Sequence, residues 1–88
     1  MEEEALAELL KGEFLSEAYH VTTFMGYRAR PDGTDKKVTV TLLDAGPSRP
    51  DLRYRVRVDD EDGNHADGNP AARIDLAISF VHWENIDV

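Results

Sequence analysis

The segment RARPDGTDKKVTVTLL constrains the fold more than any other part of this chain, because it has the pattern of two strands joined by a tight turn. Pro31 and Gly33 occupy positions that turns favour. Residues 36–43 then form a candidate strand, in which Val38, Val40 and Leu42 make an apolar side and Lys37, Thr39 and Thr41 a polar side. A strand that is apolar on one side only lies in a sheet with one covered face. The segment therefore predicts an antiparallel hairpin with one buried side.

Two further segments have the composition and period of strands. Residues 19–30 are rich in β-branched and aromatic side chains, although Gly26 weakens the strand and is a candidate site for a bulge. Residues 52–58 alternate Leu52, Tyr54, Val56 and Val58 with three arginines. A loop with Gly and Pro precedes this third strand, and a polar loop over residues 59–68 follows it. Short connections of this kind predict a three-stranded antiparallel meander.

Helical patterns stand at both ends of the chain. Residues 2–11 place Leu6, Leu9 and Leu10 on one side of a helix, and Gly12 either ends or bends it before residues 13–18 add a turn or two. Near the other end, Asn69 is a candidate N-cap and Pro70 a candidate first helical residue. Apolar side chains at helical spacing then predict an amphipathic helix over residues 70–83, marked by Ile74, Ala77, Ile78 and Val81.

The predicted fold class is α+β, with the order α-β-β-β-α over a single domain of residues 1–88. We expect both helices on the apolar face of the three-stranded antiparallel sheet. This element order resembles that of the double-stranded-RNA-binding domain and, more loosely, the β-β-β-α order of small antitoxin-type domains. The RNA-binding family binds phosphates with lysines at the start of its last helix. At that position this chain reads NPAAR, in which Arg73 is the only basic residue. The resemblance therefore implies a fold, and the function of the family is not carried over.

The balance of charge excludes one class of function. Eighteen Asp and Glu against ten Lys and Arg give a net charge of −8, which repels phosphate at long range and argues against nonspecific coating of nucleic acid. The chain has no cysteine, which excludes disulfides and thiolate metal sites. Its beginning is acidic where a signal peptide is basic, and no apolar run approaches the ~18–20 residues that span a bilayer. We expect a cytoplasmic protein that makes no membrane contact.

The stretch DLRYRVRVDD is unusual in so acidic a chain, because it sets arginines at every second position. If the apolar side of each strand is covered, these arginines lie on the open face of the sheet. We expect up to six basic side chains on that face, together with Thr39 and Thr41: Arg53, Arg55, Arg57, Lys37, Arg28 and Arg30. The molecule would then have acidic helices and a basic sheet.

Several interpretations of this row stay open. The arginines can be solvated side chains whose stems cover apolar surface and whose charges discourage edge pairing. They can instead form a docking face for an anionic partner, either an acidic protein or a nucleic acid, because arginine pairs with carboxylate and phosphate in a bidentate way. A bulge at Gly26 would move Arg28 and Arg30 to the other face. Rival functions are an acidic inhibitor or nucleic-acid mimic that presents Glu2–Glu4 and Asp59–Asp62 to a basic partner, and a homodimer.

Catalytic and metal-binding patterns are weak throughout. DDEDGN resembles a calcium loop, but the alignment places Val58 and Asn69 where the first ligand and the bidentate glutamate belong. The three histidines lack metal-ligand spacing, and Ser79 with His82 lacks a nucleophile-elbow sequence. We therefore expect no cofactor and no catalytic residue, and interpret the chain as a non-catalytic binding module or small regulator.

Overall fold

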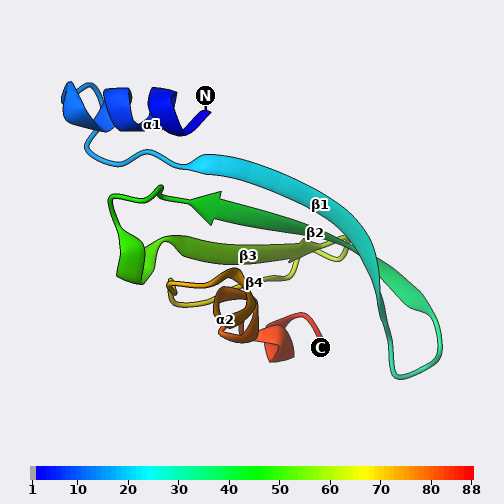
Figure 1. Cartoon of the computed structure of the whole chain (residues 1–88). Coiled ribbons are helices and arrows are strands. Elements are labelled where there is room, and N and C mark those ends of the chain that lie inside the picture. Colours follow the sequence, from blue (N-terminus) through cyan, green and yellow to red (C-terminus); the bar gives the residue numbers. More distant parts are fainter. Residues whose placement is uncertain (1) are drawn as a thin grey trace.

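The computed structural model describes residues 2–88 and the side chains of residues 4–88 (Figure 1). Its elements are α1 (Glu2–Lys11), β1 (His20–Ala29), β2 (Asp35–Asp44), the 3-10 helix η1 (Pro50–Leu52), β3 (Tyr54–Asp60), β4 (His65–Asp67), α2 (Ile74–Ser79) and the 3-10 helix η2 (Trp83–Asn85). The strands form one antiparallel sheet in the order β1-β2-β3-β4. The α+β class is confirmed, whereas the predicted three-stranded sheet is wrong because a fourth strand is present.

The fourth strand lies within residues 59–68, which the sequence predicted as a polar loop. β3 continues to Asp60, and a turn containing Gly63 at a φ of 89° leads into β4. The Asp60 N–H donates to the Asn64 carbonyl at 2.9 Å, which closes the hairpin. Ala66 is the one apolar residue in this short strand and lies buried opposite Val58. A single small inward residue gives too weak an alternation to predict a strand.

The C-terminal helix is shorter than predicted and begins later. Ala71 exchanges two backbone hydrogen bonds with Tyr54, at 2.9 and 2.8 Å, so the chain is still extended where Asn69 and Pro70 predicted a helix start. The helix begins at Ile74 after an extended Arg73, which makes no side-chain capping bond. It ends at Ser79, and η2 forms a separate turn. Pairing with β3 therefore overrides the local helix signal.

The N-terminal helix has the predicted bounds, and the Gly12 N–H makes its last bond, to the Glu8 carbonyl at 2.9 Å. The left-handed residue that follows is Glu13, with a φ of 59°, and not Gly12. Residues 13–18 form turns and bends in place of the predicted extra helical turn. Leu6 is buried against Gly46, whose φ of 86° and missing side chain let the helix approach the turn after β2.

A small core lies on one side of the sheet, beneath α2 and η2 (Figure 1). Its buried members are Val38, Val56, Val58, Ala66, Ala71, Ala77, Val81 and Ile86. α1 lies apart from α2, beside the start of β1, and Leu6 is the one described side chain of α1 that lines a hollow shared with Leu42 and Ile74. The β1–β2 hairpin extends beyond the other elements, which gives a radius of gyration of 15.0 Å where about 12 Å is typical of a compact chain of this length. Most of β1 is therefore left exposed.

No helix among residues 2–88 has the length and apolar character needed to cross a membrane.

Candidate binding surface

The register of the hairpin decides which side chains share a face of the sheet. Even-numbered residues of β1 lie opposite even-numbered residues of β2, and Gly26 pairs with Val38 without a bulge. Because directly opposed residues point to the same side, the odd-numbered residues of β1 and β2 lie away from the core. We call this side the open sheet face, and its members are Val21, Thr23, Met25, Tyr27, Ala29, Asp35, Lys37, Thr39, Thr41, Leu43, Arg55, Arg57, Asp59, His65 and Asp67.

The open sheet face keeps three of the six predicted basic residues, namely Lys37, Arg55 and Arg57. Arg53 precedes β3 and is held in place by Asp44. Its guanidinium donates to both carboxylate oxygens, at 2.8 and 3.1 Å, and lies 5.1 Å from the centre of the Tyr54 ring. These hydrogen bonds hold the pKa of Asp44 below its usual value although burial opposes the shift. Arg53 is therefore a partly buried structural link between the two ends of the β2–β3 connection.

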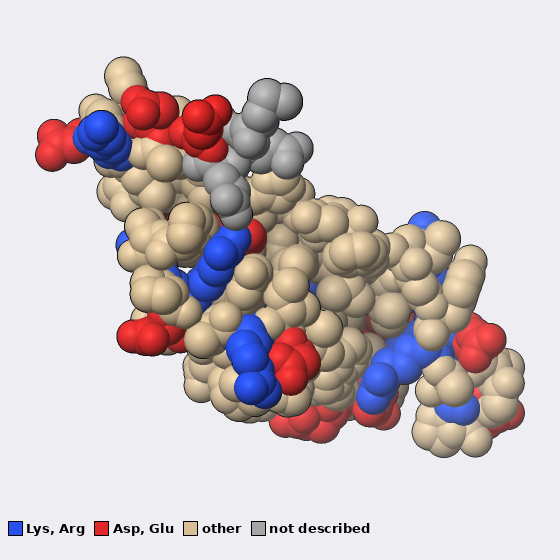
Figure 2. Space-filling view, in the orientation of Figure 1, with Lys and Arg blue, Asp and Glu red and all other residues tan. Residues whose placement is uncertain are grey.

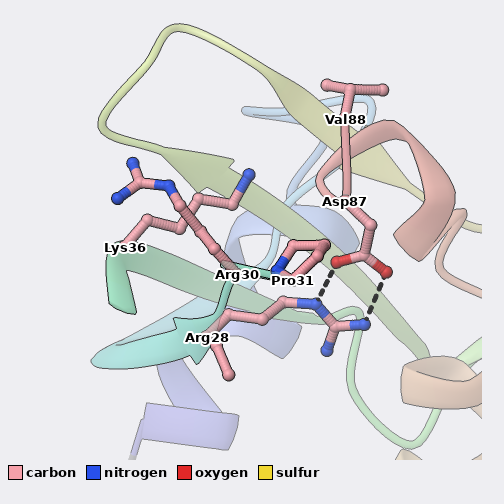
Figure 3. Close-up of a pocket in the computed structure, with 7 residues that line it drawn as sticks. Arg28, Arg30, Pro31, Lys36, Asp87 and Val88 are labelled. Atoms are coloured by element: carbon pink, nitrogen blue, oxygen red, sulfur yellow. Dashed lines mark hydrogen bonds and ion pairs between the residues drawn. The ribbon is translucent and has the colours of Figure 1, made fainter. Parts of the chain in front are cut away.

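Arg28 and Arg30 lie on the opposite face, so the expectation that they extend the row is wrong. Arg28 is opposite Lys36 and donates to both oxygens of Asp87 at 2.5 and 2.9 Å (Figure 3). Its guanidinium also stacks 4.6 Å from the centre of the Trp83 ring. Arg30 donates to Asp62 at 3.0 Å. The physical reason is the phase of the hairpin, because the register sets the even-numbered residues of β1 opposite the core-side residues of β2, with no bulge at Gly26.

Charge on the open sheet face is balanced. The Arg57 guanidinium donates to both oxygens of Asp59, at 3.3 and 3.2 Å, and Arg55 lies 3.6 Å from Asp67. Lys37 makes no side-chain ion pair within residues 4–88. Basic and acidic side chains also lie beside one another on the face of the molecule that Figure 2 shows. The expected division into acidic helices and a basic sheet is therefore wrong.

The sequence did not predict the apolar part of this face. Val21, Met25 and Tyr27 are 53%, 58% and 67% exposed, and their cross-strand neighbours are Leu43, Thr39 and Lys37. The expectation that Arg28 and Arg30 lie on the open face implied that these three residues, which alternate with them along β1, point inward. The signal that could have corrected it is the loop between the strands, because its length fixes which residues of β1 oppose the apolar residues of β2. The open sheet face thus combines an apolar stripe on β1, threonines on β2 and ion pairs on β3 and β4.

A buried ion pair lies on the core side and was also missed. The Lys36 ammonium, 3% exposed, lies 3.0 Å from Asp60 Oδ2 and donates to the Ile86 carbonyl. Asp60 also accepts hydrogen bonds from the Asn64 side chain and from the N–H groups of Asp62 and Asn64. Burial raises the pKa of Asp60, but these bonds together hold it far below its usual value.

The calcium-like loop is therefore organised around a structural carboxylate. Asp60 binds Lys36 and closes the β3–β4 turn, while Glu61 and Asp62 pair with Arg30. Within the described part of the chain, no three His, Asp or Glu side chains gather as a metal site.

A hollow of about 470 Å³ lies between the β1–β2 hairpin and the C-terminal residues, lined by Arg28, Ala29, Arg30, Pro31, Lys36, Asp87 and Val88 (Figure 3). Its three cations already pair with the carboxylates of Asp87, Asp62 and Asp60. An anion entering this hollow would have to displace those carboxylates, so the open sheet face is the stronger candidate for binding.

Comparison of this chain with protein-family models, with curated proteins and with solved structures finds no match.

Proposed function

We propose that this protein is a non-catalytic binding module that docks a protein partner on the open sheet face. The observation that carries the proposal is the exposure of Val21, Met25 and Tyr27 directly beside Lys37 and the two threonines of β2. Aromatic, Met and Arg side chains are enriched where proteins meet, and contiguous exposed apolar surface marks such sites. The partner would cover the apolar stripe and extend across β2.

The charges next to the stripe favour a partner segment that carries carboxylates. The Lys37 ammonium has no ion-pair partner among the side chains of residues 4–88, and the pairs of Arg55 and Arg57 are about half exposed. Exposed ion pairs of this kind contribute only about 0–1 kcal/mol, so a partner carboxylate can exchange with Asp67 or Asp59 at little cost. A protein segment of alternating apolar and acidic residues therefore fits the face better than a nucleic acid, because the face has no excess of positive charge.

The acidic-inhibitor alternative has less support. Of the acidic residues 59–62 that it requires, Asp59 pairs with Arg57, Asp60 is buried, and Glu61 and Asp62 pair with Arg30. The side chains of Glu2 and Glu3 lie outside the described residues. Of the acidic side chains on α1 that the structure describes, Glu4 and Glu8 are exposed.

The test compares affinities for an extended peptide in which glutamate alternates with leucine and phenylalanine, measured by isothermal titration calorimetry. We expect the double change K37Q/R57Q to weaken binding by about tenfold, which corresponds to about 1.4 kcal/mol. The matched control is R73Q, because Arg73 pairs with Asp75 two residues away as Arg57 pairs with Asp59, but lies at the start of α2. R73Q should bind like the wild type.

Two results would contradict the proposal. One is an equal loss of affinity in R73Q, which would show that general charge and not the open sheet face attracts the peptide. The other is binding of a lysine–leucine peptide with no binding of the glutamate peptide, which would support the acidic-inhibitor alternative.

A further inference from the structure

The outer edge of β1 has no backbone partner within the described chain. The Arg30 N–H donates to the Thr34 carbonyl at 2.6 Å, so the even-numbered residues of β1 direct their backbone groups toward β2. The odd-numbered residues direct theirs outward, along the free edge of the sheet. These residues are Val21, Thr23, Met25, Tyr27 and Ala29. An unpaired row of this length is a template for another strand.

The usual protections of an edge are missing from this strand. From His20 to Tyr27 there is no proline, no Asp, Glu, Lys or Arg, and no bulge. Val21, Phe24, Met25 and Tyr27 are all more than half exposed. The opposite edge of the sheet, β4, is only three residues long and exposes His65 and Asp67. The β4 edge is therefore poorly suited to pairing with another strand, whereas the β1 edge is available for it.

We propose that two copies of this chain join edge to edge through β1, antiparallel, with Met25 opposite Met25 of the second copy on the two-fold axis. The sheet then continues through eight strands, and about ten backbone hydrogen bonds form between the odd-numbered residues of the two β1 strands. A second copy fits because, with Met25 on the axis, the antiparallel pair places the neutral stretch 23–27 of each chain against the same stretch of the other. Two chains of net charge −8 can approach closely only where such charges are absent.

The register follows from Gly26. An ideal Cβ at Gly26 would have no atom within 4 Å, so open space lies beside this residue. With Met25 on the axis, Phe24 of each copy lies opposite Gly26 of the other and can cover it, as aromatic residues do for glycines in sheets. The same pairing sets Arg28 and Arg30 of one copy opposite Thr22 and His20 of the other, so that no two arginines face each other. Shape and charge both favour this register.

The first test is the mass in solution, by size-exclusion chromatography with light scattering from low micromolar to millimolar concentration. We expect the wild type to have twice the 9.9 kDa mass of the chain. M25K should be monomeric, because it sets two ammonium groups face to face on the axis. T39K is the matched control, since Thr39 lies beside Met25 on the same face but one strand inward, and it should remain a dimer. A monomeric wild type at millimolar concentration would overturn the proposal.

The second test fixes the register and does not depend on the stability of M25K. The chain has no cysteine, so a single introduced cysteine cross-links only to its own copy. Under mild oxidation M25C should form a disulfide-linked dimer, because directly opposed Cα atoms about 5.5 Å apart suit a disulfide. F24C should stay monomeric on a non-reducing gel. Cross-linking of F24C in place of M25C would overturn the register. Neither result bears on peptide binding, so this proposal and the proposed function fail separately.

Discussion

At the scale of single residues, the buried Lys36–Asp60 pair connects three parts of the chain that lie far apart in sequence. Lys36 is at the start of β2, Asp60 ends β3, and the Ile86 carbonyl comes from the C-terminal segment. A buried charge that loses its partner is costly, because the other charge is left without water and without compensation. The alternation of β2 placed Lys36 on the apolar side, yet the sequence alone does not show which carboxylate would meet it there.

We expect K36M to lower the free energy of unfolding by about 3 kcal/mol or more, since it leaves the Asp60 carboxylate buried and unpaired. The matched control is K37M, in which the same change is made at the adjacent exposed position. It should alter stability by no more than about 0.5 kcal/mol. Urea denaturation of the three proteins measures both values, and equal stability of K36M and wild type would show that the pair does not hold the C-terminal segment.

Asp60 should make the folded protein less stable as the pH falls into the acidic range. Its pKa in the folded protein lies far below the ordinary value of 3.8, so its contribution is present above pH ~4 and is lost as pH falls toward the folded pKa. The carboxyl ¹³C resonance of Asp60 should therefore keep its ionised shift below pH 3.8 for as long as the protein stays folded. Protonation of Asp60 near pH 4 in the folded state would contradict the hydrogen-bond arrangement described above.

At the scale of elements, the connection from β4 to α2 depends on a close approach at Gly68. A Cβ built there would lie 2.5 Å from the carbonyl carbon and oxygen of Phe80, which are backbone atoms and cannot move aside cheaply. We expect G68A to cost about 1–3 kcal/mol through overpacking. G26A is the matched control, because its Cβ would meet no atom within 4 Å, and it should be neutral or slightly stabilising.

Thermal denaturation followed by circular dichroism compares the two alanine variants. A G68A protein as stable as G26A would mean that α2 can shift away from β4, and the packing of the helix would have to be revised.

Elements whose bounds depend on nearby residues could be predicted from the sequence. Elements whose bounds depend on contacts between distant residues could not. α1 has its glycine stop and apolar stripe, and the first hairpin has its Pro-Asp-Gly turn, so both are found where predicted. The late start of α2 depends on the pairing of Ala71 with Tyr54, a contact between residues seventeen positions apart. Local capping signals at Asn69 and Pro70 carry no information about that contact, which is why they predicted the wrong start.

At the scale of the whole molecule, the register between β1 and β2 determines which side chains of β1 lie on the open sheet face. The same alternation that correctly placed Lys37, Arg55 and Arg57 there assigned the wrong side of β1, because the phase of one strand relative to the next depends on the loop between them. The predicted row of six cations is in fact a mixed surface with an apolar stripe. The distribution of charge over the folded chain, and not its net charge, determines what this face can bind.

An amide NMR titration with the glutamate–leucine–phenylalanine peptide tests whether the open sheet face is the contact surface that we propose. We expect shifts in β1, β2 and β3, centred on Tyr27, Lys37 and Arg57, that weaken as salt is raised because the charges involved are exposed. Shifts confined to α1, or an absence of shifts with this peptide at low salt, would rule out the open sheet face as the peptide-binding surface.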